Sequence, residues 1–232
     1  GDRMAKIVTD QLIFAVDVAN KRSYEDGTGT SWYDLSASNL TGTLTNGPTF
    51  SDLNGGFISL DGSNDYVDFG NDVVTPALPF SLQCWVNFPT LGVNEPIFTS
   101  SYHSSNRYGF SAQKNTSNQI AIHINDGGVS GSAARRSGKV SSPTLAANTW
   151  YNLALVWRGA TDMSIYYDAV PQTVSYDGSG GAINYGSSKP ARIGHFLSHY
   201  AEVKISQLAI YDKGLTVDEI LQNYEAKKGR YL

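Results

Sequence analysis

Pairs of carboxylates are the first residues in this sequence that could do chemistry. Retaining hydrolysis of a glycosidic bond needs two carboxyl groups about 5 Å apart. Two candidate pairs are Asp61 with Asp65 and Asp162 with Asp168, and each pair flanks a segment with the character of a turn or hairpin. The chain also has no order of His, Ser and Asp typical of a hydrolase elbow. The sequence therefore disfavours a glycoside hydrolase, and we predict no catalytic residue.

A metal site is the next possibility. Asp61, Asn64 and Asp65 could offer the hard oxygen ligands that calcium prefers. The same residue types cap tight turns, and turn capping is the reading we favour. His195 and His199 would suit a metal only on a helix, whereas the residues around them indicate a loop, so we expect both at the surface. No cofactor is predicted.

Sugar recognition needs an aromatic face together with amide, carboxylate or guanidinium groups for the hydroxyls. Most of these residue types lie in Ser100 to Asn148, the longest irregular region. Loops on a rigid scaffold commonly carry specificity, so we look for the binding residues here first. The candidate carbohydrate-binding or partner-binding residues are Trp85, Tyr102, His103, Asn106, Arg107, Tyr108, Asn125, Asp126, Arg135 and Arg136. Other readings stay open: Trp85 packs in the core, the loop aromatics contact a neighbouring subunit, and the two last arginines form a solvated pair or an interface anchor.

The elements that must position these residues are strands. Turn signals such as Asp61-Gly62 and Asp177-Gly178 separate short segments with a two-residue period, which is typical of a sandwich. In Phe80 to Phe88 the apolar row excludes Trp85, and Tyr151 to Trp157 is apolar on both faces, as in a central strand. Further strands are expected at 57–69, 120–124, 163–167 and 203–211.

One helix is predicted near the end of the chain. Thr216 and Glu219 form a capping box ahead of Val217, Ile220, Leu221 and Tyr224, which recur at helical spacing. We expect this apolar stripe to pack on the sandwich.

Composition excludes several classes of function. Charged residues make up 16% of the 232 residues and the net charge is -4, which is not the charge pattern of a nucleic-acid-binding protein. Cys84 is the only cysteine, so no intrachain disulfide can form. No apolar run is long enough to insert in a membrane. Asp10, Gln11 and Asp17 interrupt the early apolar residues, so no signal peptide is expected.

Four blocks of the sequence together span nearly the whole chain: Phe57 to Val67, Pro79 to Val86, Trp150 to Ala154 with Ile165 to Asp168, and Ile205 to Thr216 continuing to Tyr224. In content and order they resemble the laminin-G-like and pentraxin-like branch of the concanavalin A-like lectin/glucanase superfamily. The resemblance implies an all-β jelly-roll sandwich of two antiparallel sheets with one short C-terminal helix, in a single domain over residues 1–232.

The chain departs from the family where the chemistry would be. The glucanases of this superfamily carry a Glu-x-Asp-x-x-Glu arrangement, and this sequence contains none. Calcium-binding relatives often have an acidic residue early in the closing strand, where this chain has Gln207. The resemblance therefore implies a noncatalytic protein and weakens the calcium reading.

A narrower likeness points to a biological setting. Phe14 to Asn20, Trp32 to Ser36 and the ending Gln222 to Tyr224 are similar to versions common in tailed-phage virion proteins. This likeness implies a capsid decoration, fibre or tail-surface role, with other virion proteins or a second copy as partners and host glycans as ligands. A stand-alone carbohydrate-binding lectin is the alternative, and a glycoside hydrolase is the disfavoured third.

Overall fold

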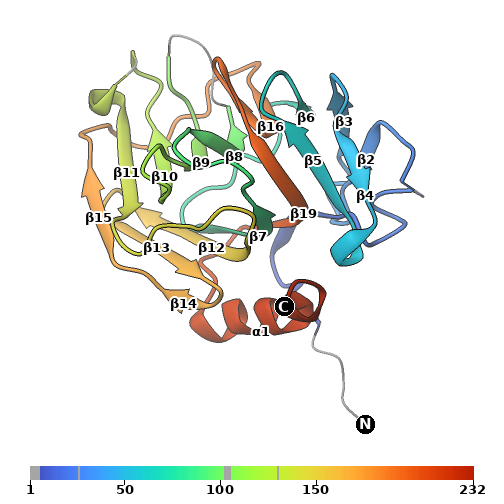
Figure 1. The fold of residues 1–232 in the computed structure, drawn as a ribbon. Coiled ribbons are helices and arrows are strands. Elements are labelled where there is room, and N and C mark those ends of the chain that lie inside the picture. The colour runs from blue at the N-terminus through green and yellow to red at the C-terminus, as the bar shows by residue number, and fades with distance from the viewer. Residues whose placement is uncertain (1–5, 26, 102–105, 130) are drawn as a thin grey trace.

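The protein is described from a computed structural model, which covers residues 6–25, 27–101, 106–129 and 131–232. Two large antiparallel sheets face each other, as the alternating pattern predicts, and the C-terminal helix lies across one of them (Figure 1). No helix in the described residues is long and apolar enough to cross a membrane. The predicted sandwich with one short helix is confirmed.

In the described residues, sheet A has eight strands: seven follow the order β14-β13-β12-β7-β19-β5-β4, and β1 pairs with β19 beside this path. Its strands are β1 (Leu12–Asp17), β4 (Thr49–Ser51), β5 (Phe57–Asp61), β7 (Phe80–Asn87), β12 (Trp150–Gly159), β13 (Asp162–Tyr167), β14 (Val170–Pro171) and β19 (Glu202–Tyr211). The strand that is apolar on both faces, β12, lies inside the sheet between β13 and β7, as expected.

Sheet B has nine strands within the described part of the chain, in the order β15-β11-β10-β9-β8-β16-β6-β3-β2. Its strands are β2 (Ser31–Tyr33), β3 (Thr41–Thr45), β6 (Tyr66–Asn71), β8 (Glu95–Ser100), β9 (Phe110–Lys114), β10 (Ile120–Asn125), β11 (Arg135–Val140), β15 (Val174–Asp177) and β16 (Pro190–Ile193). A separate hairpin joins β17 (His195–Phe196) to β18 (His199–Tyr200). The region that the sequence indicated as irregular thus holds β9 and β11 as well as the predicted β10.

The core between the sheets is aromatic at its centre. Phe80 lies 4.8 Å from Trp157 and 4.7 Å from Phe110, measured between ring centroids, and all three side chains are fully buried. Cys84 is also fully buried in this core, and burial raises the pKa of its thiol. The lone cysteine is therefore a small core side chain and not a nucleophile.

The outer face of sheet A is covered by α1 (Val217–Lys227) and the residues after it. Thr216 accepts a hydrogen bond from the backbone of Glu219, whose carboxylate accepts one from the backbone of Thr216, so the capping box forms as predicted. The buried stripe differs from the prediction. Ile220 and Asn223 face the sheet, whereas Val217 and Leu221 face solvent.

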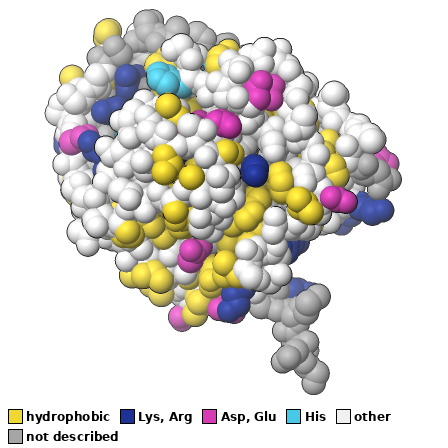
Figure 2. Space-filling view, in the orientation of Figure 1, with side chains coloured by type: hydrophobic (Ala, Val, Ile, Leu, Met, Phe, Trp, Pro, Cys, Tyr) yellow, Lys and Arg dark blue, Asp and Glu magenta, His cyan; other side chains and the backbone are white. Residues whose placement is uncertain are grey.

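Asn223, and not Val217 or Leu221, is buried under the helix because the sheet is polar at this point. Its amide nitrogen donates to Gln83 at 2.9 Å and to Tyr211 at 3.1 Å, and its amide oxygen accepts from the backbone of Val8. The face that carries sheet A and α1 is mostly uncharged, with isolated charges, and apolar side chains lie at its lower edge near α1 (Figure 2). Low charge density is thus visible at the surface.

Candidate functional site

The loops predicted to carry specificity meet at one end of sheet B, which we call the loop end. The backbone N–H of Arg107 donates to the carbonyl of Gly128, and the carbonyl of Arg107 accepts from the backbone N–H of Gly127. Asn106 pairs with Val129 as an isolated bridge. The structure therefore brings together the described members of the predicted set: Asn106, Arg107, Tyr108, Asn125, Asp126, Arg135 and Arg136. Tyr102 and His103 lie outside the described residues.

Several of these side chains hold the loops in place. Asp126 accepts hydrogen bonds from the backbone of Gly128 and Gly181, both at 2.8 Å, and the bonds from Gly181 and Gly128 lower the pKa of its carboxyl. Arg136 donates to the carbonyls of Gly178 and Gly180. Asn125 is fully buried and donates to the carbonyls of Tyr108 and Gly109. These three residues primarily fix backbone, as does Asn106, whose amide donates to the carbonyl of Gly127. Arg107, Tyr108 and Arg135 are the other partly exposed members of the set.

Trp85 is taken out of the predicted set. It points to the outer face of sheet A and is fully buried beneath the C-terminal residues, with its ring 4.2 Å from that of Tyr231 and 5.7 Å from that of Tyr224. A covered indole cannot stack on a sugar, so the core-packing reading describes this residue.

The predicted calcium ligands form a tight turn between β5 and β6. Asp61 accepts hydrogen bonds from the backbone of Ser63 at 2.8 Å and Asn64 at 3.3 Å, which lower the pKa of its carboxyl. Asp65 is buried, and burial followed by the charge of Asp61 raises its pKa. Within the described residues, no group of three or more His, Cys, Asp or Glu side chains could hold a metal ion. Turn capping is the observed role of Asp61.

A second site lies at the opposite end of sheet B, and we call it the acidic pocket. It has a volume of about 520 Å³ and is lined by the β5–β6 turn, the β7–β8 loop, the β9–β10 turn and the β17–β18 hairpin. The lining residues are Asp61, Gly62, Thr90, Gly92, Val93, Asn94, Glu95, Thr116, Ser198, His199, Tyr200 and Glu202. Three carboxylates, an amide, three aliphatic hydroxyls, the ring of His199 and the phenol of Tyr200 thus surround one hollow.

Glu95 is the deepest of these carboxylates. Its Oε2 accepts a hydrogen bond of 2.7 Å from the backbone of Glu202, and only 2% of the residue is exposed. Burial is the main reason that the pKa of Glu95 rises to about 7, because water solvates the charged form better than the protein does. The charge of Glu202 adds to this rise, whereas the buried ammonium of Lys114, opposite Glu95 on β9, opposes it.

The aromatic side of the acidic pocket is held rigidly. The ring of Tyr200 stacks on His195 with centroids 4.4 Å apart, and Tyr66 packs against His195 at 5.1 Å. Arg192 holds this group through a hydrogen bond of 3.0 Å to Nδ1 of His195 and an ion pair of 2.8 Å with Asp68. His195 is therefore packed into the hairpin, which corrects the expectation that it is a surface residue.

Sequence reasoning missed most of the acidic pocket. Asp61 was singled out for a metal, but Glu95, Tyr200 and Glu202 carry no motif and come from distant parts of the chain. Only the register between strands places them together: Asp61 on β5 faces Glu202 on β19. The one available signal was Glu95 itself, a carboxylate beside proline at the start of an apolar strand.

Replacing Glu95 with glutamine tests its raised pKa. In the native protein Glu95 keeps its proton to higher pH than in the unfolded chain, so the wild type loses stability as pH rises from 4.5 to about 7. The difference corresponds to about 3 kcal/mol in the free energy of unfolding. Urea unfolding at pH 4.5 and pH 8 should show that the wild type changes by this amount relative to the Glu95→Gln variant, because contributions from other groups are common to both proteins. Equal pH slopes for the two proteins would contradict the assignment.

Comparison with known proteins agrees with this architecture. The sandwich, its C-terminal helix and the loop-lined hollows at its ends define a lectin-like jelly roll. Residues 61–221 match the family model for the concanavalin A-like lectin/glucanases superfamily, so the chain belongs to that superfamily. The search of curated protein sequences finds no match.

Solved structures share the fold at low sequence identity. The binding domain of Paraclostridial Mosquitocidal Protein 1 has a TM-score of 0.67 at 13% identity, covering 92% of this chain and 52% of that one. The Botulinum Neurotoxin Type G receptor-binding domain has a TM-score of 0.65 at 16% identity, covering 94% and 51%. Trypanosoma rangeli sialidase, solved in complex with sialic acid, has a TM-score of 0.63 at 13% identity, covering 97% and 34%. This chain thus spans about half the length of the first two of these domains.

Proposed function

We propose that this chain is a noncatalytic glycan-binding domain and that the acidic pocket is its sugar site. The observation that carries the proposal is the convergence of Glu95, Glu202 and Tyr200 on one hollow of about 520 Å³. Carboxylates accept hydrogen bonds from sugar hydroxyls, and an aromatic face packs against the apolar face of a pyranose. The solved neighbours include the Botulinum Neurotoxin Type G receptor-binding domain and the ligand-binding domain of Botulinum neurotoxin serotype D in complex with N-acetylneuraminic acid, which supports the same class of ligand.

Both deep carboxylates already have structural partners, which supports a binding role over catalysis. Glu95 accepts from the backbone of Glu202, and Glu202 in turn accepts a hydrogen bond from the hydroxyl of Thr90. A hydrolase needs one carboxylate free to attack or to activate water. These contacts instead fix the two side chains as acceptors.

Substitution at the aromatic wall tests where the sugar binds. A glycan array on the wild type identifies the best ligand, and titration calorimetry then compares variants. Tyr200→Ala should weaken that ligand at least about tenfold because the stacking face is lost. Tyr108→Ala, which removes a partly exposed ring at the loop end, is the matched control and should bind normally. The reverse pattern would move the site to the loop end.

A glycoside hydrolase is the second candidate, and one observation favours it. The pKa of about 7 for Glu95 is the value that a general acid needs near neutral pH. Incubation with laminarin and xylan, followed by a reducing-sugar assay, decides between the two. We expect no turnover; turnover that Glu95→Gln abolishes would establish the enzyme.

The setting we propose is the surface of a tailed-phage particle, where the domain would meet host glycans. The blocks Phe14 to Asn20 and Trp32 to Ser36 support it through their likeness to virion proteins. Association with other virion proteins or with a second copy belongs to the same proposal. Copurification with intact particles at a fixed copy number tests it, and a protein found only free in the lysate would argue for the stand-alone lectin.

A further inference from the structure

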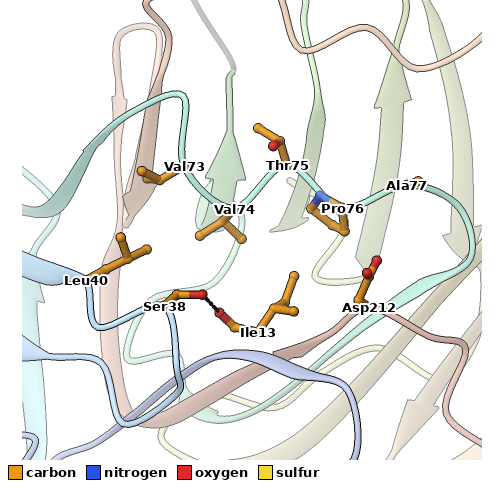
Figure 3. Close-up of a pocket in the computed structure, with 9 residues that line it drawn as sticks. All are labelled: Ile13, Ser38, Leu40, Val73, Val74, Thr75, Pro76, Ala77 and Asp212. Carbon is orange, nitrogen blue, oxygen red and sulfur yellow. Dashed lines mark hydrogen bonds between the residues drawn. The ribbon is translucent and has the colours of Figure 1, made fainter.

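A separate pocket lies at the seam between the two sheets, and we call it the seam pocket. Its volume is about 370 Å³, and its walls come from β1, from the segment before β3, from the connection between β6 and β7, and from the end of β19. The lining residues are Ile13, Ser38, Leu40, Val73, Val74, Thr75, Pro76, Ala77 and Asp212 (Figure 3). Because β6 runs from the acidic pocket toward this seam, the two pockets lie at opposite ends of the sandwich.

The backbone of the seam pocket is strained at Val74. This residue has a φ of 54°, a conformation that a β-branched side chain rarely adopts and that costs on the order of 1 to 3 kcal/mol. The buried hydroxyl of Ser100 holds the strained peptide by donating to the carbonyl of Val74 at 2.6 Å. Two residues on, the hydroxyl of Tyr185 donates to the carbonyl of Pro76 at 2.6 Å.

Asp72 anchors the start of the same segment. Its carboxylate accepts hydrogen bonds from the backbone of Ser188 at 2.9 Å and Lys189 at 3.2 Å. With both ends and the middle fixed, the connection keeps Val74 directed into the hollow, where it faces Ile13 and Leu40 (Figure 3). The partly buried carbons of Ile13, Leu40, Val73 and Val74 form an apolar surface continuous with the main core. The strained conformation of Val74 is therefore part of an apolar wall that is already formed in the free protein.

Asp212 gives this apolar pocket a single charge. It is the one charged side chain among the nine lining residues, it is exposed, and its carboxylate forms no hydrogen bond or ion pair with the part of the chain that the structure describes. Ser38 donates its hydroxyl to the carbonyl of Ile13 and so is already occupied. The carboxylate enters the pocket from the side opposite Leu40 (Figure 3). A complementary ligand therefore has an apolar part on one side and a positively charged hydrogen-bond donor on the other.

We propose that the seam pocket binds a small ligand with an aliphatic body and one ammonium group. The body packs on Val74, Ile13 and Leu40, and the ammonium pairs with Asp212. A carboxylate of the same size would be repelled by Asp212, and an alcohol would gain no charge pairing. The volume fits a small molecule, since ligand pockets generally start near about 300 Å³. This site is independent of sugar binding in the acidic pocket.

Methyl-detected NMR with three matched probes tests the proposal. The probes are butylammonium, 1-butanol and butyrate, which share a four-carbon body and differ in charge at neutral pH. Butylammonium should shift the methyl signals of Ile13, Leu40, Val73 and Val74 at lower concentration than butanol, and butyrate should shift them least. Equal response to all three, no response, or shifts spread over the whole protein would overturn the proposal.

Substituting the carboxylate gives the second arm. Asp212→Asn should weaken butylammonium at least about threefold while leaving butanol unchanged, because only the charge pair is removed. Asp218→Asn, on the exposed first turn of α1, is the matched control and should change neither. Asp212 is exposed, and an unchanged methyl spectrum of the free variant verifies that it folds. An Asp212→Asn variant that binds butylammonium like the wild type would also overturn the proposal.

Discussion

Replacing Trp85 with alanine is expected to lower the free energy of unfolding by about 3 to 5 kcal/mol. The indole is fully buried on the outer face of sheet A, between the central strands and the C-terminal residues. Its ring stacks on Tyr231 and Tyr224, so the substitution leaves a cavity and removes the surface on which the chain end packs. The melting temperature should fall by about 6 to 20 °C for a chain of this size.

Trp85→Phe is the matched control because it keeps an aromatic ring at the same place. It should cost clearly less than the alanine variant, since part of the stacking and most of the volume remain. The nearby C-terminal contacts give a second readout: Arg230 pairs with Asp17 at 2.9 Å, and Tyr231 donates to Ser206 at 2.6 Å. In Trp85→Ala the last residues should become sensitive to carboxypeptidase. A loss below about 1 kcal/mol would show that the helix packs without the indole.

Acidification is expected to destabilise the protein through His123. Burial is the main reason that its pKa falls to about 3, with the charge of Arg135 second, so the imidazole stays neutral in the native state. The unfolded chain takes up a proton below about pH 6.5, so stability that is present above that pH is lost as pH falls toward 3. The full difference corresponds to about 4 to 5 kcal/mol in the free energy of unfolding.

One ring nitrogen of this histidine is engaged by a neighbouring hydroxyl: Nδ1 of His123 lies 2.8 Å from the Oγ of Ser137, and both side chains are buried. Protonating the neutral ring would place a charge in a buried site near Arg135.

His123→Gln isolates the contribution because glutamine cannot take up a proton. The variant starts less stable at pH 7 but should show a smaller loss between pH 7 and pH 4, measured by urea unfolding. Glu95 acts in the opposite direction, since its raised pKa makes the fold gain stability as pH falls from about 7 to 4.5. The double variant with Glu95→Gln separates the two slopes. If the stability of His123→Gln had the same pH dependence as that of the wild type, the imidazole would take up its proton at the same pH in the folded and unfolded states.

The sequence predicted those strands whose buried residues form a recognisable apolar pattern within the strand itself. In β7 and β12 the apolar residues alternate or run continuously, so the pattern identifies them without any partner. β9 and β11 were missed because their sequences, Phe110 to Lys114 and Arg135 to Val140, are rich in Ser, Gln, Arg and Lys. Each of them pairs with one edge of β10, and this pairing stabilises both strands despite their polar composition.

The helix shows the same division in one element. Its start was predictable because a capping box is a local contact between Thr216 and Glu219. Its buried face was not, because a hydrophobic stripe does not reveal a polar partner. Asn223 is buried only because Gln83 and Tyr211, far away in sequence, offer hydrogen bonds where it lands.

By itself the sequence determined the two-layer sandwich, its single helix and the loop end, because period and turn chemistry are written in neighbouring residues. Only the tertiary structure decided which polar groups share a hollow. Asp61, Glu95 and Glu202 meet because antiparallel register brings distant strand ends to one edge. Val74 and Asp212 line one pocket, and the hydroxyl of Ser100 holds the strained peptide of Val74 there. Such meetings depend on how strands pair across the fold, and no short stretch of sequence records that pairing.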